Sequence, residues 1–223
     1  MMKWTQDFQL FLFDFDGLLV DTESMHHQAY VLMLEAEGFK LDWSHAKFCS
    51  VAHLNATALK EALYAEFPKL DPDWKRLYAT KKRLYEELIA TGKIGLMPGV
   101  EKLLIHLAKQ DVRRCVVTNS FYPQIEAIRN HIPALQTIPH WITREHYEKA
   151  KPDPEGYLLA IQRHGKPRDR IVGFEDSIRG LQALMGTTAL PVLVCASHHP
   201  LMELAGTAVI HYESFEKIPE RLM

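Results

Sequence analysis

Four short apolar runs along the chain predict β-strands. The runs are Leu10 to Phe15, Arg114 to Thr118, Ile171 to Phe174 and Pro191 to Cys195. Nearly continuous apolar strands are typical of a parallel sheet that helices cover on both faces. Apolar residues at intervals near three and four predict helices between the last three runs, at Gln124 to Asn130, Pro154 to His164 and Ser177 to Met185. This alternation predicts an α/β fold with a doubly wound, Rossmann-like parallel sheet.

The interval between the first and second predicted strands is too long for a single crossover. It predicts three successive helices, at Glu23 to Glu37, Ala56 to Glu66 and Trp74 to Ala90. Pro98-Gly99 then marks the return to the sheet, and Val100 to Ala108 predicts the helix that precedes the second strand. We therefore expect an all-α helical cap at residues 22–95, inserted into a catalytic core made of residues 1–21 and 96–223.

The composition is that of an ordinary globular protein, with 47% hydrophobic and 24% charged residues among 223. The net charge of -2 gives no indication of a nucleic-acid partner. No apolar run approaches the roughly 18 residues of a membrane span, and aspartates interrupt the apolar segment near the N-terminus. We expect a cytoplasmic protein with neither a nucleic-acid nor a membrane partner, and nothing in the sequence requires more than a monomer.

Polar residues follow three of the predicted strands. They are Asp14 and Asp16 after the first, Thr118, Asn119 and Ser120 at the end of the second, and Glu175 with Asp176 after the third. Parallel strands would bring all of them to one edge of the sheet, where open α/β sheets bind their ligands. Four carboxylates in one crevice would repel each other and be costly to desolvate. A hard cation such as Mg²⁺ would relieve that repulsion and would also attract phosphate oxygens.

Four segments of the chain resemble the motifs of the haloacid dehalogenase superfamily, in its phosphatase and phosphomutase branch. The segments are Asp14 to Glu23, Val116 to Ser120, Lys151 to Glu155, and Gly173 to Ser177 with Gly180. They occur in the order of the family and span nearly the whole predicted core. A helical cap inserted after the first motif also resembles the subgroup of β-phosphoglucomutase and many sugar-phosphate phosphatases.

The resemblance implies a covalent mechanism with an aspartate nucleophile. Asp14 would attack phosphorus to give an aspartyl-phosphate, and Asp16 would act as the general acid and base. The resemblance also implies a Mg²⁺ ion held by Asp14, the Asp16 carbonyl and Asp176, with Glu175 binding directly or through water.

The second and third motifs imply the phosphate contacts. The Thr118 hydroxyl would donate to a phosphoryl oxygen, with backbone amides near Asn119 and Ser120 assisting. Lys151 would supply a positive charge to the phosphate and to Asp14. Each of these residue types alone has an ordinary structural explanation, but their order and spacing favour an enzyme.

Two residues of the predicted cap are candidates for substrate binding. His26 resembles a position near the hinge that helps proton transfer in the mutase branch, although packing at a helix start explains it equally well. Lys81 belongs to the run Lys81-Lys82-Arg83, and such runs usually form a solvated face. The chain crosses between core and cap at Thr22 and at Leu96 to Gly99, which we expect to act as hinges.

The segment Cys49 to Asn55 departs from the mutase pattern because it lacks the arginine that would hold a second phosphate. We therefore expect a phosphatase that hydrolyses a small phosphorylated metabolite, with sugar or polyol phosphates favoured. A phosphomutase and a catalytically silent, phosphate-binding regulatory protein are the alternatives.

Overall fold

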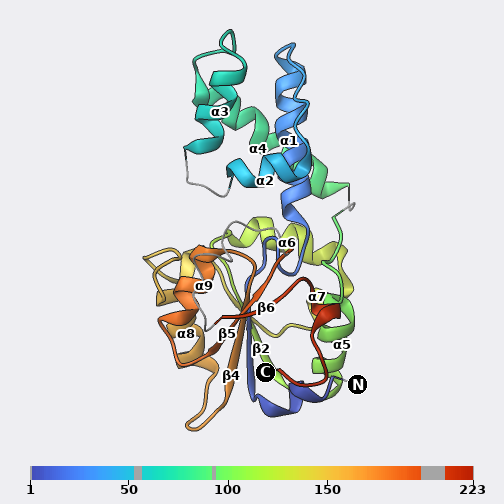
Figure 1. Cartoon of the computed structure of the whole chain (residues 1–223), viewed down its shortest axis with the longest axis vertical. Helices are drawn as coiled ribbons and strands as arrows, with labels where there is room; N and C mark the ends of the chain where they lie inside the picture. The colour runs from blue at the N-terminus through green and yellow to red at the C-terminus, as the bar shows by residue number, and fades with distance from the viewer. Residues whose placement is uncertain (1, 53–56, 92–93, 197–208, 223) are drawn as a thin grey trace. The chain divides into compact units, whose positions relative to one another are not determined.

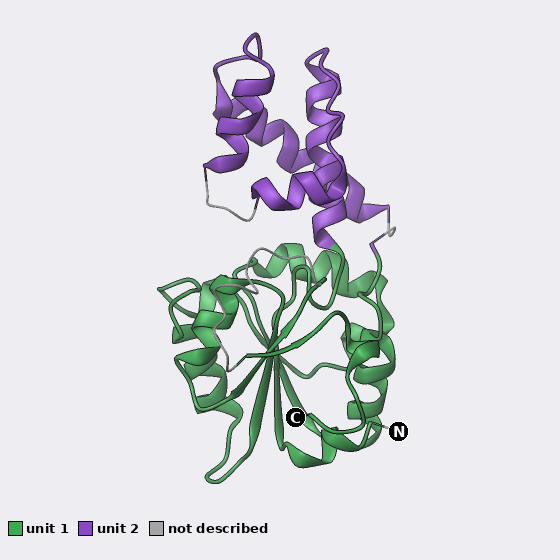
Figure 2. Ribbon diagram, viewed as in Figure 1, with its two compact units in different colours: residues 1–21, 95–223 green, residues 22–94 purple. Residues whose placement is uncertain are grey.

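The computed structural model of the chain describes residues 2–52, 57–91, 94–196 and 209–222 (Figure 1). The chain divides into two compact units (Figure 2). The core unit comprises residues 1–21 and 95–223, and the helical unit comprises residues 22–94. No helix among the described residues is both long and apolar enough to cross a membrane.

A parallel sheet forms the centre of the core unit. Its strands within the described residues are β1 (Leu10–Phe13), β2 (Arg113–Val117), β3 (His140–Ile142), β4 (Ile171–Glu175), β5 (Leu190–Val194) and β6 (Ile210–Tyr212). They lie in the order β3-β2-β1-β4-β5-β6, and every neighbouring pair is parallel. The predicted doubly wound α/β class is therefore confirmed.

The strand order reverses beside β1. The chain proceeds outward from β1 to β2 and β3, and then returns to place β4 on the other side of β1. A topological switch point of this kind leaves a crevice outside the carboxyl ends of the two central strands. The residues that follow β1 and β4 therefore lie at the usual ligand-binding position of such a sheet.

Helices cover both faces of the sheet, as the continuous apolar strands require. They are α5 (Val100–Lys109), α6 (Tyr122–His131), α7 (Pro133–Gln136), α8 (Glu155–His164) and α9 (Ile178–Met185). Figure 1 shows α8 and α9 on one side and α5 with α7 on the other. Leu10 and Leu12 face the cluster that includes residues of α8 and α9. Phe11 and Phe13 alternate with them, and both stack with Phe174.

The helical unit has an apolar core of its own. Its helices are α1 (Thr22–Ala36), α2 (His45–Ala52), α3 (Ala58–Glu66) and α4 (Trp74–Ala90). Met33, Leu63 and Leu77 belong to this core and are fully buried. Trp43 is 6% exposed and belongs to the same cluster, so its role is to pack the helical unit.

The two crossings between the units are joined by backbone hydrogen bonds. The amide of Asp21 donates to the carbonyl of Gly95, and the amide of Met97 donates to that of Leu19, both at 3.0 Å. Val20 and Leu96 form an antiparallel bridge between these bonds. The two ends of the inserted segment are thus adjacent on the core. A hinge at Thr22 and at Leu96 to Gly99 stays a prediction.

The structure adds elements that the apolar pattern did not indicate. The edge strands β3 and β6 have three residues each and include His140 and His211, so they lack the continuous apolar run of a central strand. The first strand also ends at Phe13 and not at Phe15. The chain leaves the sheet there because Phe15 begins a tight turn, in which its carbonyl accepts hydrogen bonds from the amides of Leu19 and Val20.

Candidate active site

The turn after β1 places Asp14 and Asp16 at the switch point. The amide of Asp14 donates to the carbonyl of Phe174 on β4 at 3.0 Å, which fixes the nucleophile candidate beside β4. Gly17 closes the turn with a backbone φ of 76°, a conformation that residues with a side chain rarely adopt. A Cβ atom at Gly17 would lie 2.2 Å from Oδ2 of Asp176. Glycine is therefore required here for both the backbone angle and the close approach of Asp176.

Lys151 lies at the centre of a buried hydrogen-bond network. Its ammonium donates to Oδ1 of Asp14, to Oε1 of Glu175 at 2.6 Å and to the carbonyl of Val117 at 2.7 Å. Burial lowers the pKa of Lys151, but the charges of Asp14 and Glu175 outweigh burial and hold that pKa above its ordinary value. The ammonium therefore stays charged at neutral pH and joins β1, β2 and β4 at one point.

Three carboxylates lie close enough together to share one cation. Oxygen atoms of Asp14, Glu175 and Asp176 all lie within 4.8 Å of one another. Burial and, after it, the Asp14 carboxylate raise the pKa of Glu175 above its ordinary value, although Lys151 opposes the shift. Oε2 of Glu175 is buried and accepts no hydrogen bond from the described residues.

This donor set fits a hard divalent cation. With all three carboxylates ionised, the Lys151 ammonium compensates only one of three negative charges, and oxygen ligands suit Mg²⁺. Gly180 leaves room for the Glu175 carboxylate, because a Cβ atom at this position would lie 1.9 Å from it. An ion beside Oε2 of Glu175 would also satisfy that buried oxygen.

The loop after β2 contacts the Asp16 carboxylate. The hydroxyls of Thr118 and Ser120 donate to Oδ2 of Asp16, at 3.2 Å and 2.6 Å. The amide of Ser120 donates to the Thr118 hydroxyl oxygen at 2.9 Å. The structure therefore brings the predicted acid-base residue and the predicted phosphate loop together. In this arrangement the Ser120 amide already has a partner in Thr118.

The side chain of Asn119 orders the loop from within. Its Oδ1 accepts a hydrogen bond from the amide of Lys151 at 3.2 Å and lies 2.8 Å from the hydroxyl of Tyr147. The Arg179 guanidinium donates to the carbonyl of Lys151 at 2.8 Å. The backbone of Lys151 is thus held from two sides, which aligns its ammonium with Asp14.

The two cap candidates meet in the helical unit. Lys81 is 5% exposed and its ammonium donates to Nδ1 of His26 at 2.7 Å. Burial and the Lys81 charge lower the pKa of His26 to about 3, so the imidazole is neutral and can accept this hydrogen bond. His26 also stacks on Tyr85, with ring centroids 4.1 Å apart. Its neighbour Lys82 is exposed. The expectation that this charge run forms a solvated face therefore holds for Lys82 and is wrong for Lys81.

Sequence reasoning missed three residues that support the site, namely Tyr147, Tyr157 and Arg179. The hydroxyl of Tyr157 donates to Oε1 of Glu175, and that of Tyr147 lies 2.7 Å from the carbonyl of Thr118. Tyrosines among apolar residues indicate only that the rings pack in the core. Nothing in the sequence pattern therefore predicted the hydrogen bonds of their hydroxyls. Arg179 follows Ser177 of the fourth motif, and no sequence pattern distinguishes it from an ordinary surface arginine.

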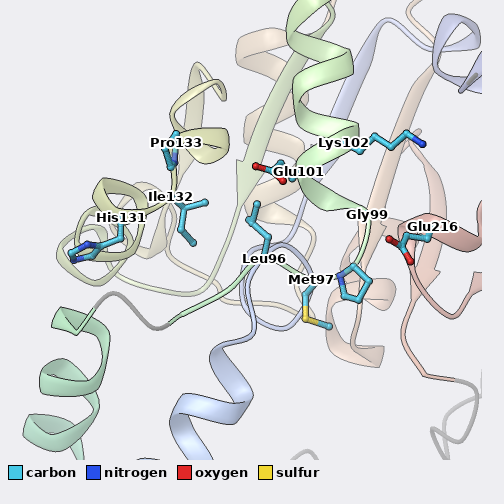
Figure 3. A pocket seen from close by; sticks show the side chains of 10 residues that line it. Leu96, Met97, Gly99, Glu101, Lys102, His131, Ile132, Pro133 and Glu216 are labelled. Atoms are coloured by element: carbon cyan, nitrogen blue, oxygen red, sulfur yellow. The ribbon is translucent and has the colours of Figure 1, made fainter.

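A separate cavity of about 500 Å³ lies on the core unit (Figure 3). Its lining includes Leu96 to Gly99, the start of α5, and the segment His131 to Pro133. None of the predicted catalytic or metal-binding residues lines it. The cavity therefore lies beside Leu96 to Gly99, where the chain returns from the helical unit to the core unit, and is distinct from the carboxylate cluster.

The fold is that of an α/β protein with an acidic candidate active site at its topological switch point. The family model of haloacid dehalogenase-like hydrolases matches residues 8–185. The chain belongs to this family, and the predicted enzyme class, a haloacid dehalogenase-type hydrolase, is confirmed.

Individual relatives agree with this assignment. Protein CbbY of Cereibacter sphaeroides is 30% identical over 183 residues, which cover 78% of this chain and 79% of the relative. A phosphorylated carbohydrates phosphatase of Thermotoga maritima is 29% identical over 176 residues, which cover 77% of this chain and 78% of the relative. The crystal structure of CbbY from Rhodobacter sphaeroides in complex with phosphate has a TM-score of 0.71 at 26% identity, with 93% of this chain and 95% of that chain covered.

Proposed function

We propose that the protein is a Mg²⁺-dependent phosphatase that hydrolyses a small phosphorylated metabolite through an aspartyl-phosphate on Asp14. The observation that supports it most directly is the buried contact of Lys151 with both Asp14 and Glu175, beside a third carboxylate. Relatives that include a phosphorylated carbohydrates phosphatase favour a sugar or polyol phosphate as the substrate.

In the proposed reaction, Asp14 attacks phosphorus and the leaving alcohol departs. The Lys151 ammonium donates a hydrogen bond to Oδ1 of Asp14, which orients the carboxylate. Its positive charge also offsets the repulsion between this carboxylate and the approaching phosphoryl group. A magnesium ion held by Asp14, Asp176, the Asp16 carbonyl and Glu175 would neutralise charge on the phosphoryl oxygens.

Asp16 is the proposed proton donor and acceptor. Its carboxylic acid gives a proton to the leaving oxygen, and the resulting carboxylate then takes a proton from the water that hydrolyses the aspartyl-phosphate. The hydroxyls of Thr118 and Ser120 hold this carboxyl group between the two steps. When substrate binds, Thr118 can turn its hydroxyl toward a phosphoryl oxygen, and the loop amides near Asn119 and Ser120 assist.

Residues 22–95 act as the cap in this proposal, and residues 1–21 and 96–223 act as the catalytic core of a monomeric, cytoplasmic enzyme. Closure of such a cap excludes bulk water and limits which leaving groups fit. His26 and Lys81 are the proposed cap contacts with the substrate. The rings of Tyr30, Tyr78 and Tyr85 lie 4.9 to 5.8 Å from the Lys81 ammonium. This ammonium lies against these rings and the neutral His26 imidazole, and the charge of Glu23 favours its charged form, which suits it to an anionic ligand.

Replacing Lys81 with methionine should raise KM for the substrate about tenfold with a smaller change in kcat, because a charged hydrogen bond to the ligand is lost. The wild-type KM should also rise between pH 7 and pH 9. Burial lowers the pKa of Lys81 to about 8 and Glu23 opposes the shift, so the positive charge is lost as pH rises through that value. His26 stays neutral across this range.

Steady-state kinetics at both pH values would test this role, with the exposed Lys82→Met variant as the matched control. A Lys81→Met enzyme with an unchanged KM, or with the same pH dependence of KM as the wild type, would remove Lys81 from the substrate site.

Hydrolysis is preferred over the mutase alternative because Cys49 to Asn55 offers no arginine for a second phosphate. Cys49 to Ala52 lie in α2, whereas residues 53–55 of this segment lie outside the described residues. The silent regulatory alternative is disfavoured because simple phosphate binding does not require a second carboxylate such as Asp16.

A panel of phosphorylated metabolites assayed in ¹⁸O-labelled water tests the function directly. A phosphatase should release phosphate that contains solvent oxygen, with turnover lost in a chelator and restored by Mg²⁺. A phosphomutase would instead convert one sugar phosphate isomer into another with almost no phosphate release. Binding of phosphate esters without either reaction would support the alternative of a catalytically silent, phosphate-binding regulatory protein.

A further inference from the structure

Two tyrosine hydroxyls reach the active site from the apolar cluster beneath it. Tyr157 lies on α8 and is fully buried, and Tyr147 follows a short 3-10 helix (Arg144–His146) and is 6% exposed. Both rings belong to the same core cluster on the face of the sheet that α8 covers. Their hydroxyls nevertheless contact different parts of the site.

The Tyr157 hydroxyl contacts the side of the site that would hold the metal. It donates a hydrogen bond to Oε1 of Glu175 and lies 3.1 Å from the ammonium of Lys151. Lys151 donates to the same oxygen of Glu175. Two donors therefore occupy Oε1, while Oε2 is buried without a hydrogen-bond partner among the described residues. Rotation of the Glu175 carboxylate would break both hydrogen bonds at Oε1.

The Tyr147 hydroxyl contacts the loop that would bind phosphate. It lies 2.7 Å from the carbonyl of Thr118 and 2.8 Å from Oδ1 of Asn119. The same Asn119 oxygen accepts from the backbone amide of Lys151. Tyr147 thus fixes the conformation of the loop whose hydroxyls and amides would face the phosphoryl group, and it does not contact the carboxylate cluster through any hydrogen bond among the described residues.

We propose that these two tyrosines are positioning residues with separate tasks, Tyr157 holding Glu175 for the metal ion and Tyr147 holding the Thr118 loop for the phosphate. This inference rests on the proposed function, because it assigns each hydroxyl to one ligand of that reaction. Neither tyrosine touches the reacting atoms, so both act through the residues that they orient.

Phenylalanine at either position keeps the buried ring and removes only the hydroxyl. Tyr157→Phe should weaken Mg²⁺ binding about tenfold, because a metal ligand that loses its supporting hydrogen bond is less well oriented. Tyr147→Phe should weaken binding of inorganic phosphate about fivefold at saturating Mg²⁺, which corresponds to one lost hydrogen bond. Each variant should leave the other ligand's affinity within twofold of the wild type.

Isothermal titration calorimetry with MgCl₂ alone would measure the first affinity without turnover. Titration with inorganic phosphate at saturating Mg²⁺ would measure the second. Tyr64→Phe is a matched control, because the Tyr64 hydroxyl donates to the backbone of Asp71 in the helical unit at 2.8 Å. This variant should alter neither affinity, and thermal denaturation without ligands would compare the folded state of all three variants.

Combining Tyr157→Phe with Glu175→Ala supplies a second readout. The effect of the tyrosine change on Mg²⁺ affinity should vanish when Glu175 is already altered, whereas a general packing defect would persist.

Equal losses of both affinities in both variants, or no loss in either, would overturn the division of tasks. A wild-type protein that binds Mg²⁺ and hydrolyses phosphate esters would show in that case that the proposed function survives. A wild type that binds no Mg²⁺ would overturn the proposed function and the role of Tyr157 together.

Discussion

Replacing Asp14 with asparagine should lower turnover of para-nitrophenyl phosphate with Mg²⁺ by about 10⁴-fold or more, because an amide oxygen cannot form the aspartyl-phosphate. Asparagine has nearly the same volume and can still accept the hydrogen bond that Lys151 donates to Oδ1. We therefore expect the fold to persist. Initial rates and thermal denaturation of the purified variant would measure the two effects separately.

The exposed Asp7, in the short 3-10 helix before β1, provides the control. Asp7→Asn removes one carboxylate from the same region of sequence and should leave turnover unchanged. An Asp14→Asn enzyme with substantial activity would contradict the nucleophile assignment, whatever the substrate.

Replacing Lys151 with methionine should cause the second large effect, on stability as well as on activity. The change would leave Asp14 and Glu175 buried beside each other without the cation that joins them, and breaking a buried ion pair in this way typically costs about 3–5 kcal/mol. Denaturant unfolding at pH 7 would measure the loss. Added Mg²⁺ should restore part of the stability, because a cation near the carboxylates offsets the missing ammonium.

The expected pH range follows from the direction of the pKa shift. The pKa of folded Lys151 lies above its ordinary value, so its contribution is fully present below the unfolded pKa of about 10.4 and is lost only as pH rises through the folded value. The Lys151 charge itself therefore adds no pH dependence from pH 7 to pH 9. In Lys151→Met, however, the ammonium no longer opposes the raised pKa of Glu175, so the variant should lose further stability relative to the wild type as pH rises over this range. The exposed Lys149→Met variant should match the wild type. A Lys151→Met protein as stable as the wild type would show that the buried network contributes nothing.

The central elements of the fold could be predicted because the central strands are continuous apolar runs, and because the apolar residues of the helices recur three or four positions apart. The helix α4 was predicted with its observed bounds, Trp74 to Ala90. Asp73 caps its first turn by accepting from the amide of Arg76, and the buried residues recur four positions apart. The strands β3 and β6 lie at the edges of the sheet and are short and partly polar, so no pattern distinguished them from loops.

The candidate site was predictable at the level of residues but not of side-chain contacts. Asp14, Glu175 and Asp176 converge because parallel strands end at one edge, which the alternation of predicted strands and helices already indicates. The direction of the Asn119 amide group depends on Tyr147 and on the Lys151 backbone, which are distant in the chain. The burial of Lys81 could not be predicted from the sequence either, because only the packing of α4 distinguishes it from its exposed neighbour Lys82.

The bridge between Val20 and Leu96 means that the polypeptide leaves the core and re-enters it at almost the same place. An insertion whose ends are adjacent can be lengthened, shortened or exchanged without moving the strands that flank it. Evolution can therefore alter the helical unit while the carboxylates and the lysine keep their geometry. If the helical unit sets selectivity as proposed, selectivity and chemistry can diverge independently, even though one polypeptide chain carries both.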